Sequence, residues 1–221
     1  LIEQTEKNGI KGLSGIAHTR WATHGAPEIC NTHPHFSHDQ IAVVHNGIIE
    51  NYEPLREELK AKGYVFVSET DTEVIVHLVH SYYEGDLLEA VKKTVLRLKG
   101  AYGIAVSCKD EPDRVIGAKM SAPLVVALGD KENFIASDPL ALAGVTDCYI
   151  YLEDGDVADI RPTSAQIWNR LGDEFVEIQR PVSVVQGFTS GIALGPYTHY
   201  MQKEIFEQPQ ALSDTLEGVQ F

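Results

Sequence analysis

Residues that can bind a small charged molecule gather between positions 18 and 71 of the chain. Arg20 follows a strand-like run and can hold a carboxylate through two parallel hydrogen bonds. Asp71 can present its carboxylate to the ammonium group of a ligand. The amide of Asn46 and the N–H of Gly47 can donate together to a developing oxyanion. These groups predict a site for an amino acid whose side-chain amide is attacked, and glutamine meets that description.

Each of these groups also has a purely structural interpretation. Arg20 can be a surface arginine stacked on Trp21, and Asp71 can cap the helix that follows it. An Asn-Gly pair is typical of a hairpin turn. Against the turn, the apolar run continues after Gly47 and a helical pattern follows, so no returning strand comes directly after it.

The elements that must position these groups indicate an α+β fold. Helices are expected over residues 52–62, from Thr70 to Tyr82, and from Asp86 to the glycine at 100, with Thr70 and Glu73 forming a capping box. Strands are expected at 14–21, 40–44, 64–68, 101–107, 114–118, 124–128, 134–136, 149–152, 157–160 and 166–168. Asp154 and Gly155 are expected to form the turn of a hairpin in an antiparallel sheet.

Composition excludes several classes of function. There are 32 acidic and 18 basic side chains, and the resulting charge of −14 repels nucleic acids and anionic membranes. No apolar run approaches the roughly 20 residues of a membrane span. Three scattered cysteines fit a reducing cytoplasm. Residues 1–185 are expected to form one domain, and residues 186–221 a linker rich in Gly and Ser and the start of a further segment.

Six sequence motifs resemble those of one family of enzymes. They are GIAHTRWATHG at 15–25, NTHPH at 31–35, VHNGIIEN at 44–51, SETDTEV at 68–74, GAYG at 100–103 and NFIASD at 133–138. Together they resemble the glutaminase domain of the glutamine–fructose-6-phosphate aminotransferases. The segment HYMQKEIFEQP at 199–209 is similar to the one that leads into the sugar isomerase domain of that family.

The resemblance implies a glutamine site with Asn46 and Gly47 as catalytic residues and with six substrate-binding residues, Arg20, Trp21, Thr23, His24, Gly47 and Asp71. It implies that the loop containing Arg20 binds the α-carboxylate of glutamine. Asp71 and the Gly47 backbone are implied to bind the α-amino group, and Trp21 to guard the passage of ammonia. The implied fold is the four-layer αββα sandwich of the N-terminal-nucleophile hydrolases, here lacking its first strands.

The chain departs from this family at the nucleophile. The family uses a cysteine at its N-terminus, whose own amine is the base, whereas this sequence begins with Leu1. Cys30, Cys108 and Cys148 are internal. We therefore expect an internal piece of the glutaminase domain that is inactive alone and uses neither metal nor cofactor. Its expected partners are glutamine and the sugar isomerase domain of the same protein, with a homodimer formed through that domain.

Three alternative functions are open at this point. The chain can be the glutaminase domain of an amidophosphoribosyltransferase or an asparagine synthetase, which share the Asn-Gly pair. It can be a noncatalytic domain that binds an amino acid. It can also be a metal-binding module built on His33, His35, His38 and Asp39, although these lie in one short loop without regular ligand spacing.

Overall fold

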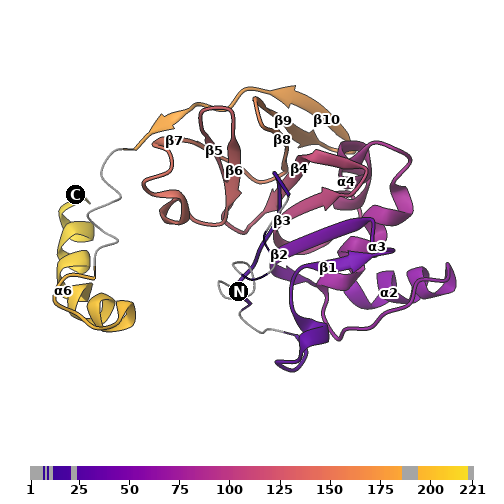
Figure 1. Cartoon of the computed structure of the whole chain (residues 1–221), viewed down its shortest axis with the longest axis horizontal. Coiled ribbons are helices and arrows are strands. Elements are labelled where there is room, and N and C mark those ends of the chain that lie inside the picture. Colours follow the sequence, from indigo (N-terminus) through magenta and orange to yellow (C-terminus); the bar gives the residue numbers. More distant parts are fainter. Residues whose placement is uncertain (1–6, 8, 10–11, 21–23, 186–193, 219–221) are drawn as a thin grey trace. The chain divides into compact units, whose positions relative to one another are not determined.

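The chain divides into two compact units, Leu1–Val185 and Gln186–Phe221 (Figure 1). The computed structural model describes residues 7, 9, 12–20, 24–185 and 194–218. The expected positions Trp21 and Thr23, and most of the expected linker, lie outside the described residues.

Two antiparallel sheets make up most of the first unit. The larger has seven strands in the order β1-β2-β3-β4-β8-β9-β10, and the smaller has four in the order β11-β7-β5-β6. The strands of the larger sheet are β1 (His35–Ser37), β2 (Ile41–Ile49), β3 (Gly100–Cys108), β4 (Glu111–Met120), β8 (Asp156–Arg161), β9 (Ser164–Leu171) and β10 (Glu174–Ile178). Those of the smaller are β5 (Val125–Leu128), β6 (Asn133–Ala136), β7 (Cys148–Tyr151) and β11 (Ser183–Val184).

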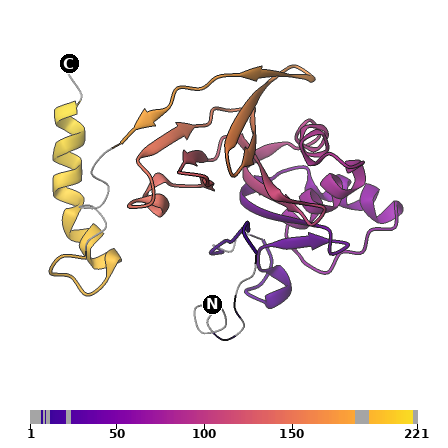
Figure 2. The ribbon, with the colours of Figure 1, turned by 45° about the horizontal axis from the view of Figure 1, so that its top comes forward.

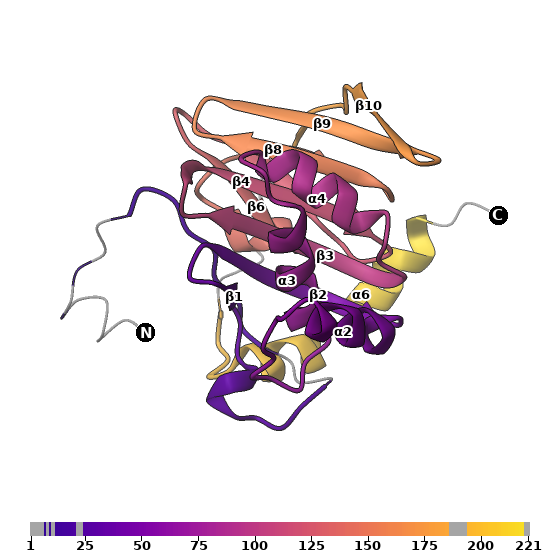
Figure 3. The same cartoon turned by 90° about the vertical axis from the view of Figure 1, so that its right-hand side faces the viewer.

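Three helices cover one face of the larger sheet, as Figure 3 shows. They are α2 (Tyr52–Ala61), α3 (Thr72–Tyr82) and α4 (Leu87–Val95). Their apolar residues recur at helical spacing and pack with those of β2, β3 and β4 into the main core. All three helices were predicted from the sequence, and Asp86 caps α4 as expected, because its side chain accepts a hydrogen bond from Leu88 N at 3.0 Å.

The smaller sheet packs on the opposite face of the larger one (Figures 1 and 2). Successive side chains of a strand point to opposite faces, so Val157 belongs to the core under the helices. Its neighbour Ala158 and Ile160 belong to a second core, which they share with Val126 and Ile150 of the smaller sheet. The described residues thus form a layer of helices, a sheet and a second sheet, and the predicted α+β class is confirmed.

Several expected elements were wrong. Residues 14–20, the described part of the first expected strand, form no strand, although their sequence pattern is typical of one. Residues 64–68 form no strand either. Asp154 and Gly155 do not join a hairpin, because β7 and β8 belong to different sheets and the chain crosses between them at this point. Strands β10 and β11 were not expected. A strand exists only where a partner strand takes up its backbone hydrogen bonds, and local residue pattern does not show that partner.

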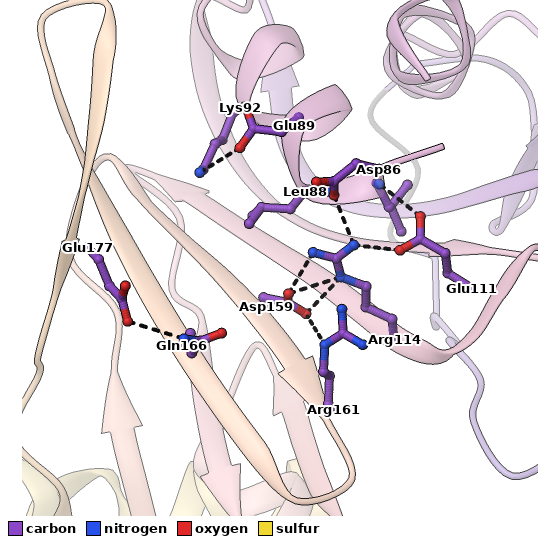
Figure 4. A network of polar contacts seen from close by, with 11 residues as sticks. Asp86, Leu88, Glu89, Lys92, Glu111, Arg114, Asp159, Arg161, Gln166 and Glu177 are labelled. Carbon is purple, nitrogen blue, oxygen red and sulfur yellow. Dashed lines mark hydrogen bonds and ion pairs between the residues drawn. The ribbon is translucent and has the colours of Figure 1, made fainter. Parts of the chain in front are cut away.

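A buried arginine joins α4 to the larger sheet (Figure 4). Arg114 on β4 donates from Nε and NH2 to the carboxylate of Asp159 on β8, at distances of 2.6–3.0 Å. Its NH1 donates to Asp86 at the start of α4 at 2.9 Å, and to Glu111. Farther along α4, the Lys92 ammonium lies 4.6 Å from the centroid of the Trp168 ring on β9. These contacts fix the position of the helix on the sheet.

Replacing Asp86 with alanine is expected to lower the free energy of unfolding by about 1 kcal/mol, the usual cost of losing a helix cap. The loss of the Arg114 contact adds little, because the Asp86 side chain is 54% exposed. Glu84→Ala is the matched control. The Glu84 side chain is 86% exposed, and its ion pair with Lys93 is long, at 3.8 Å. Urea denaturation of both variants measures the difference, and equal values for the two would contradict the cap.

The second unit contains the helix α6 (Tyr200–Gly218), with Pro209 inside it. The rings of Tyr197 and Phe206 stack within this unit at a centroid distance of 5.9 Å. Among the described residues, none of the helices combines the length and the apolar composition that a bilayer span requires.

Candidate functional site

A cavity of about 260 Å³ lies beside the second half of β2. It is lined by His18, Arg20, His24, His33, His45, Asn46, Gly47, Ile48, Thr70, Asp71 and Thr72. The structure therefore brings together five of the seven predicted site residues, which come from three separate stretches of the sequence. The other two, Trp21 and Thr23, lie outside the described residues.

Asn46 and Gly47 lie inside strand β2 and do not form a turn. They pair with Gly103 and Tyr102 of β3 in an unbroken register. Gly47 has a φ of +126°, a conformation that residues with a Cβ avoid. A Cβ at this position would also overlap the carbonyl oxygen of Ala101. Glycine is required here because β3 passes too close for any side chain.

The direction of the Gly47 N–H follows from the pairing of β2 with β3. Lys109 N donates to Gln40 O at 2.8 Å, and Glu50 N donates to Lys99 O at 2.9 Å. In an antiparallel ladder the residues that bond the neighbouring strand alternate with those that do not. Even-numbered residues of β2 therefore bond β3, and the N–H groups of odd-numbered residues, Gly47 included, face the other edge.

The amides on either side of Gly47 along that edge already have acceptors. His45 N donates to Nδ1 of His33 at 3.2 Å, and Ile49 N donates to Oδ2 of Asp71 at 2.7 Å. The N–H of Gly47 lies between them at the wall of the cavity. The site thus contains a backbone donor that faces the space where a ligand would lie.

Asp71 is buried at the wall of the cavity, and its carboxylate does not cap α3. No side-chain hydrogen bond from Asp71 caps the helix, and Thr70 Oγ1 instead accepts from Glu73 N at 3.4 Å. One carboxylate oxygen of Asp71, Oδ2, receives the Ile49 amide. The other, Oδ1, lies 4.0 Å from Nδ1 of His24. This second oxygen is positioned to receive a hydrogen bond from a ligand.

The turn before α3 is held by Glu73, whose carboxylate accepts from Val67 N and Ser68 N at 2.8 Å and from Ser68 Oγ at 2.6 Å. Burial raises the pKa of Glu73, but the nearby His77 ring and the hydrogen bonds from Ser68 and Val67 outweigh burial and lower the pKa to about 2. The capping box expected from the sequence is therefore modified, because Glu73 reaches back beyond Thr70. This anchored turn fixes the backbone of Asp71.

The guanidinium of Arg20 holds the loop beside the cavity. Its NH2 donates to the carbonyl oxygens of His24 and Gly25 at 2.7 and 2.9 Å, and its NH1 donates to that of Ala26 at 2.9 Å. A guanidinium has five N–H donors, so Nε–H and one N–H of NH1 remain. Arg20 therefore keeps its charge and two donors for an anion, in addition to shaping the loop.

Two histidines that line the cavity, His33 and His45, and the neighbouring His35 are held neutral. Burial lowers the pKa of His33 to about 3, with a further contribution from His18, and burial lowers that of His35 to about 4. Burial also lowers the pKa of His45, whose Nδ1 is 2.9 Å from Thr72 Oγ1. The role of these histidines in building the wall was not predicted. The signal was present, since His45 directly precedes Asn46 and NTHPH is one of the recognised motifs.

The alternative of a metal-binding module at His33, His35, His38 and Asp39 finds no assembled site among the described residues. The rings of His33 and His35 are 5.1 Å apart, but His38 packs instead on Tyr64 and His80. Within the described ranges, no group of three or more His, Cys, Asp or Glu side chains is arranged to hold a metal ion. His33, His35 and His38 therefore have structural contacts in place of a shared ligand.

None of the described cysteines lies at the cavity. Cys30 is exposed and its thiol is 3.8 Å from Glu28, Cys108 is buried, and Cys148 lies in β7 of the smaller sheet. The residues that line the cavity include none of the three.

Comparisons with known proteins agree with one another. A model of the glutamine amidotransferase domain matches residues 20–144. The glutamine–fructose-6-phosphate aminotransferase [isomerizing] of Bordetella pertussis is 56% identical over 225 residues, which cover 100% of this chain and 36% of the relative. That of Pseudomonas aeruginosa is 55% identical over 211 residues, covering 95% of this chain and 34% of the relative. These matches confirm the resemblance predicted from the motifs.

Solved structures give a more distant match. The glutamine phosphoribosylpyrophosphate amidotransferase from B. subtilis, complexed with ADP and GMP, aligns with a TM-score of 0.58 and 26% identity. The alignment covers 68% of this chain and 33% of that one. A structure described as the allosteric regulatory enzyme of purine biosynthesis aligns over the same shares with a TM-score of 0.57 and 27% identity. This chain spans about a third of the length of the proteins that it matches.

Proposed function

Because the chain belongs to the glutamine amidotransferase family, we propose that the cavity beside β2 binds glutamine and takes part in releasing ammonia from its side-chain amide. The observation that carries the proposal is the placement of Arg20, Asp71 and the Asn46–Gly47 pair around one space of amino-acid size. Their charges are complementary to a zwitterion, and their amide donors are complementary to a carbonyl oxygen.

Arg20 and Asp71 each bind one of the two charged groups of the ligand. Arg20 offers its remaining donors to the α-carboxylate, together with Thr23 and His24 of the same loop. The free carboxylate oxygen of Asp71 receives the α-ammonium, with the Gly47 backbone beside it. Trp21 guards the passage of ammonia away from the site. Asp71 is only 3% exposed, so water screens its carboxylate poorly and the attraction between the carboxylate and an ammonium group is strong.

The chemical step develops negative charge on the amide oxygen of glutamine. A thiolate attacks the amide carbon, the C=O bond becomes a C–O⁻ single bond, and the Asn46 amide and Gly47 N–H donate to that oxygen. The base that took the proton of the thiol gives it to the amide nitrogen. When the oxyanion collapses, the C–N bond breaks, the protonated nitrogen leaves as ammonia and a γ-glutamyl thioester remains. Water then hydrolyses the thioester to glutamate through a second oxyanion at the same position.

The thiol for this step is not one of Cys30, Cys108 and Cys148, since none of them lines the cavity. We assign it to the N-terminal cysteine that the family resemblance implies. Residues 1–221 alone should then bind glutamine without hydrolysing it. Calorimetry with glutamine and an assay of ammonia release, on residues 1–221 and on the natural protein with its flanking residues, test the two halves of this statement.

The natural protein then transfers the ammonia to fructose 6-phosphate and forms glucosamine 6-phosphate. The glutamine–fructose-6-phosphate aminotransferase of Bordetella pertussis matches the whole chain at 56% identity, and this match includes the unit Gln186–Phe221. The segment at residues 199–209 leads into a sugar isomerase domain, through which two copies associate in the cytoplasm. An amidophosphoribosyltransferase is the second candidate, favoured by the solved structures at 26% identity. Detection of glucosamine 6-phosphate or phosphoribosylamine as the product separates them.

The fold completes the proposal. We infer that the layer of helices and two sheets belongs to a four-layer αββα sandwich of the N-terminal-nucleophile type, whose first strands and outer helical layer are supplied by residues beyond those that form the described layers. Residues 1–185 are then the glutaminase domain. An experimental structure of the natural protein tests this directly.

Replacing Asp71 with asparagine is expected to raise KM for glutamine about tenfold to a hundredfold, the usual value of a hydrogen bond to a charged group. The asparagine has the same shape, so kcat should change less than KM. Asp39→Asn is the control, because Asp39 is exposed and lies outside the cavity. Unchanged glutamine affinity in Asp71→Asn would contradict the assignment of the ammonium site.

A further inference from the structure

His18 lies against the side chain of Asn46 and has no place in the mechanism above. The Nε2 of His18 and the Oδ1 of Asn46 are 2.7 Å apart, although the two residues are 28 positions apart in the chain. Both side chains lie at the cavity. The other ring nitrogen of His18, Nδ1, is buried and has no hydrogen-bond partner among the described residues. The ring proton therefore belongs on Nε2, where an acceptor is in contact with it.

The amide of Asn46 needs this contact because its two ends have nearly the same shape. One end is an NH₂ group that donates hydrogen bonds, and the other is an oxygen that only accepts them. An oxyanion is stabilised by the NH₂ group and repelled by the oxygen. The carbon skeleton of asparagine alone does not choose between the two orientations.

We propose that His18 is a positioning residue that holds the Asn46 oxygen through its Nε2–H and so directs the Asn46 NH₂ group at the carbonyl that is attacked. The inference rests on the proposed glutaminase function. In this proposal His18 acts through Asn46 and not on the reacting atoms themselves. Its contribution is to the orientation of the oxyanion hole and not to the binding of glutamine.

The position of His18 is fixed by a second ring. His33 stacks on His18 with centroids 4.3 Å apart and an interplanar angle of 20°. Nδ1 of His33 accepts the backbone N–H of His45, the residue next to Asn46, so this ring is anchored to the same strand. An imidazole nitrogen that accepts a hydrogen bond carries no proton, which keeps His33 neutral beneath His18. The stack on His33 therefore holds the His18 ring where its Nε2 contacts the amide oxygen of Asn46.

The test compares four replacements of His18 in the natural protein with its flanking residues. His18→Phe keeps a flat ring on His33 but removes the donor, and kcat for glutamine hydrolysis should fall about tenfold with little change in KM. His18→Gln offers an N–H near the position of Nε2 and should recover most of that loss. His18→Glu offers only acceptors there and should be worse than phenylalanine. His18→Ala removes both ring and donor and reports the cost of losing the stack.

A double-mutant cycle with Asn46→Ala separates positioning from general damage. Without the Asn46 amide there is nothing to orient, so His18→Phe should have no further effect on kcat in that background. Additive losses, equal activities for His18→Gln and His18→Glu, or a change confined to KM would each overturn the proposal. Absence of glutaminase activity in the unmodified protein would instead overturn the proposed function, so the two failures are distinguishable.

Discussion

Asn46→Ala is expected to lower kcat for glutamine hydrolysis by about 100- to 1,000-fold, the usual effect of removing one donor from an oxyanion hole. The ground-state carbonyl of glutamine carries little charge, whereas the tetrahedral intermediate carries a full negative charge on the oxygen that the proposed function assigns to the Asn46 amide. The loss should therefore fall on kcat, while KM for glutamine stays within about threefold. Steady-state assay of glutamate release gives both values.

Asn133→Ala is the matched control for this experiment. Asn133 lies on β6 of the smaller sheet, away from the cavity, and its Nδ2 donates to the carbonyl oxygen of Arg161 on β8 at 2.7 Å. It should leave kcat unchanged. If Asn46→Ala raised KM and left kcat alone, Asn46 would be a binding residue, and the role given to it here would be wrong.

The residues of the site were predictable from their types, but their arrangement was not. Arg20, Asn46 and Asp71 were selected because their chemistry fits the parts of glutamine. The sequence left Asn46–Gly47 open between a turn and an oxyanion hole, since both use a residue that tolerates unusual backbone angles. The structure decides against the turn, because the register of β2 with β3 continues through both residues.

The partners of these residues could not be predicted, because they depend on contacts between distant segments. His18 was expected on a strand, and nothing in its neighbourhood pointed to Asn46. Asp71 was expected either to cap α3 or to bind an ammonium, and its hydrogen bond from Ile49 N shows a third role, in which it closes the free edge of β2. Helices were predicted well, because their periodicity is local. The errors fell on strands 14–21 and 64–68 and on the Asp154–Gly155 hairpin, where pairing decides.

The largest effect on stability is expected from Arg114→Met. Both ends of the pair are buried, with side-chain exposures of 8% for Arg114 and 5% for Asp159. Burial alone would lower the pKa of Arg114, but the hydrogen bonds that it donates to Asp159 and Glu111 outweigh burial and raise the pKa, so the guanidinium stays charged. Removing it leaves the Asp159 carboxylate buried without its main partner. Loss of one member of such a pair costs about 3–5 kcal/mol, and urea denaturation should show it in the free energy of unfolding.

In Arg114→Met, the loss of stability comes mainly from the Asp159 carboxylate that is left buried without a partner, and only in smaller part from the missing contact. Arg161 is half exposed, and its Nε lies 3.5 Å from Asp159 Oδ1, so it partly compensates the buried carboxylate. We therefore expect Arg114→Met to cost about 3 kcal/mol, the lower end of the range for such pairs. Replacing both residues, Arg114→Met with Asp159→Leu, removes the stranded carboxylate and should recover most of the lost stability. Asp86 and Glu111 also lose a partner, but the Asp86 side chain is 54% exposed and can be solvated by water. If the double variant were no more stable than Arg114→Met alone, the stranded Asp159 carboxylate would not be the source of the cost, and the lost contacts of Arg114 with Asp86 and Glu111 would be.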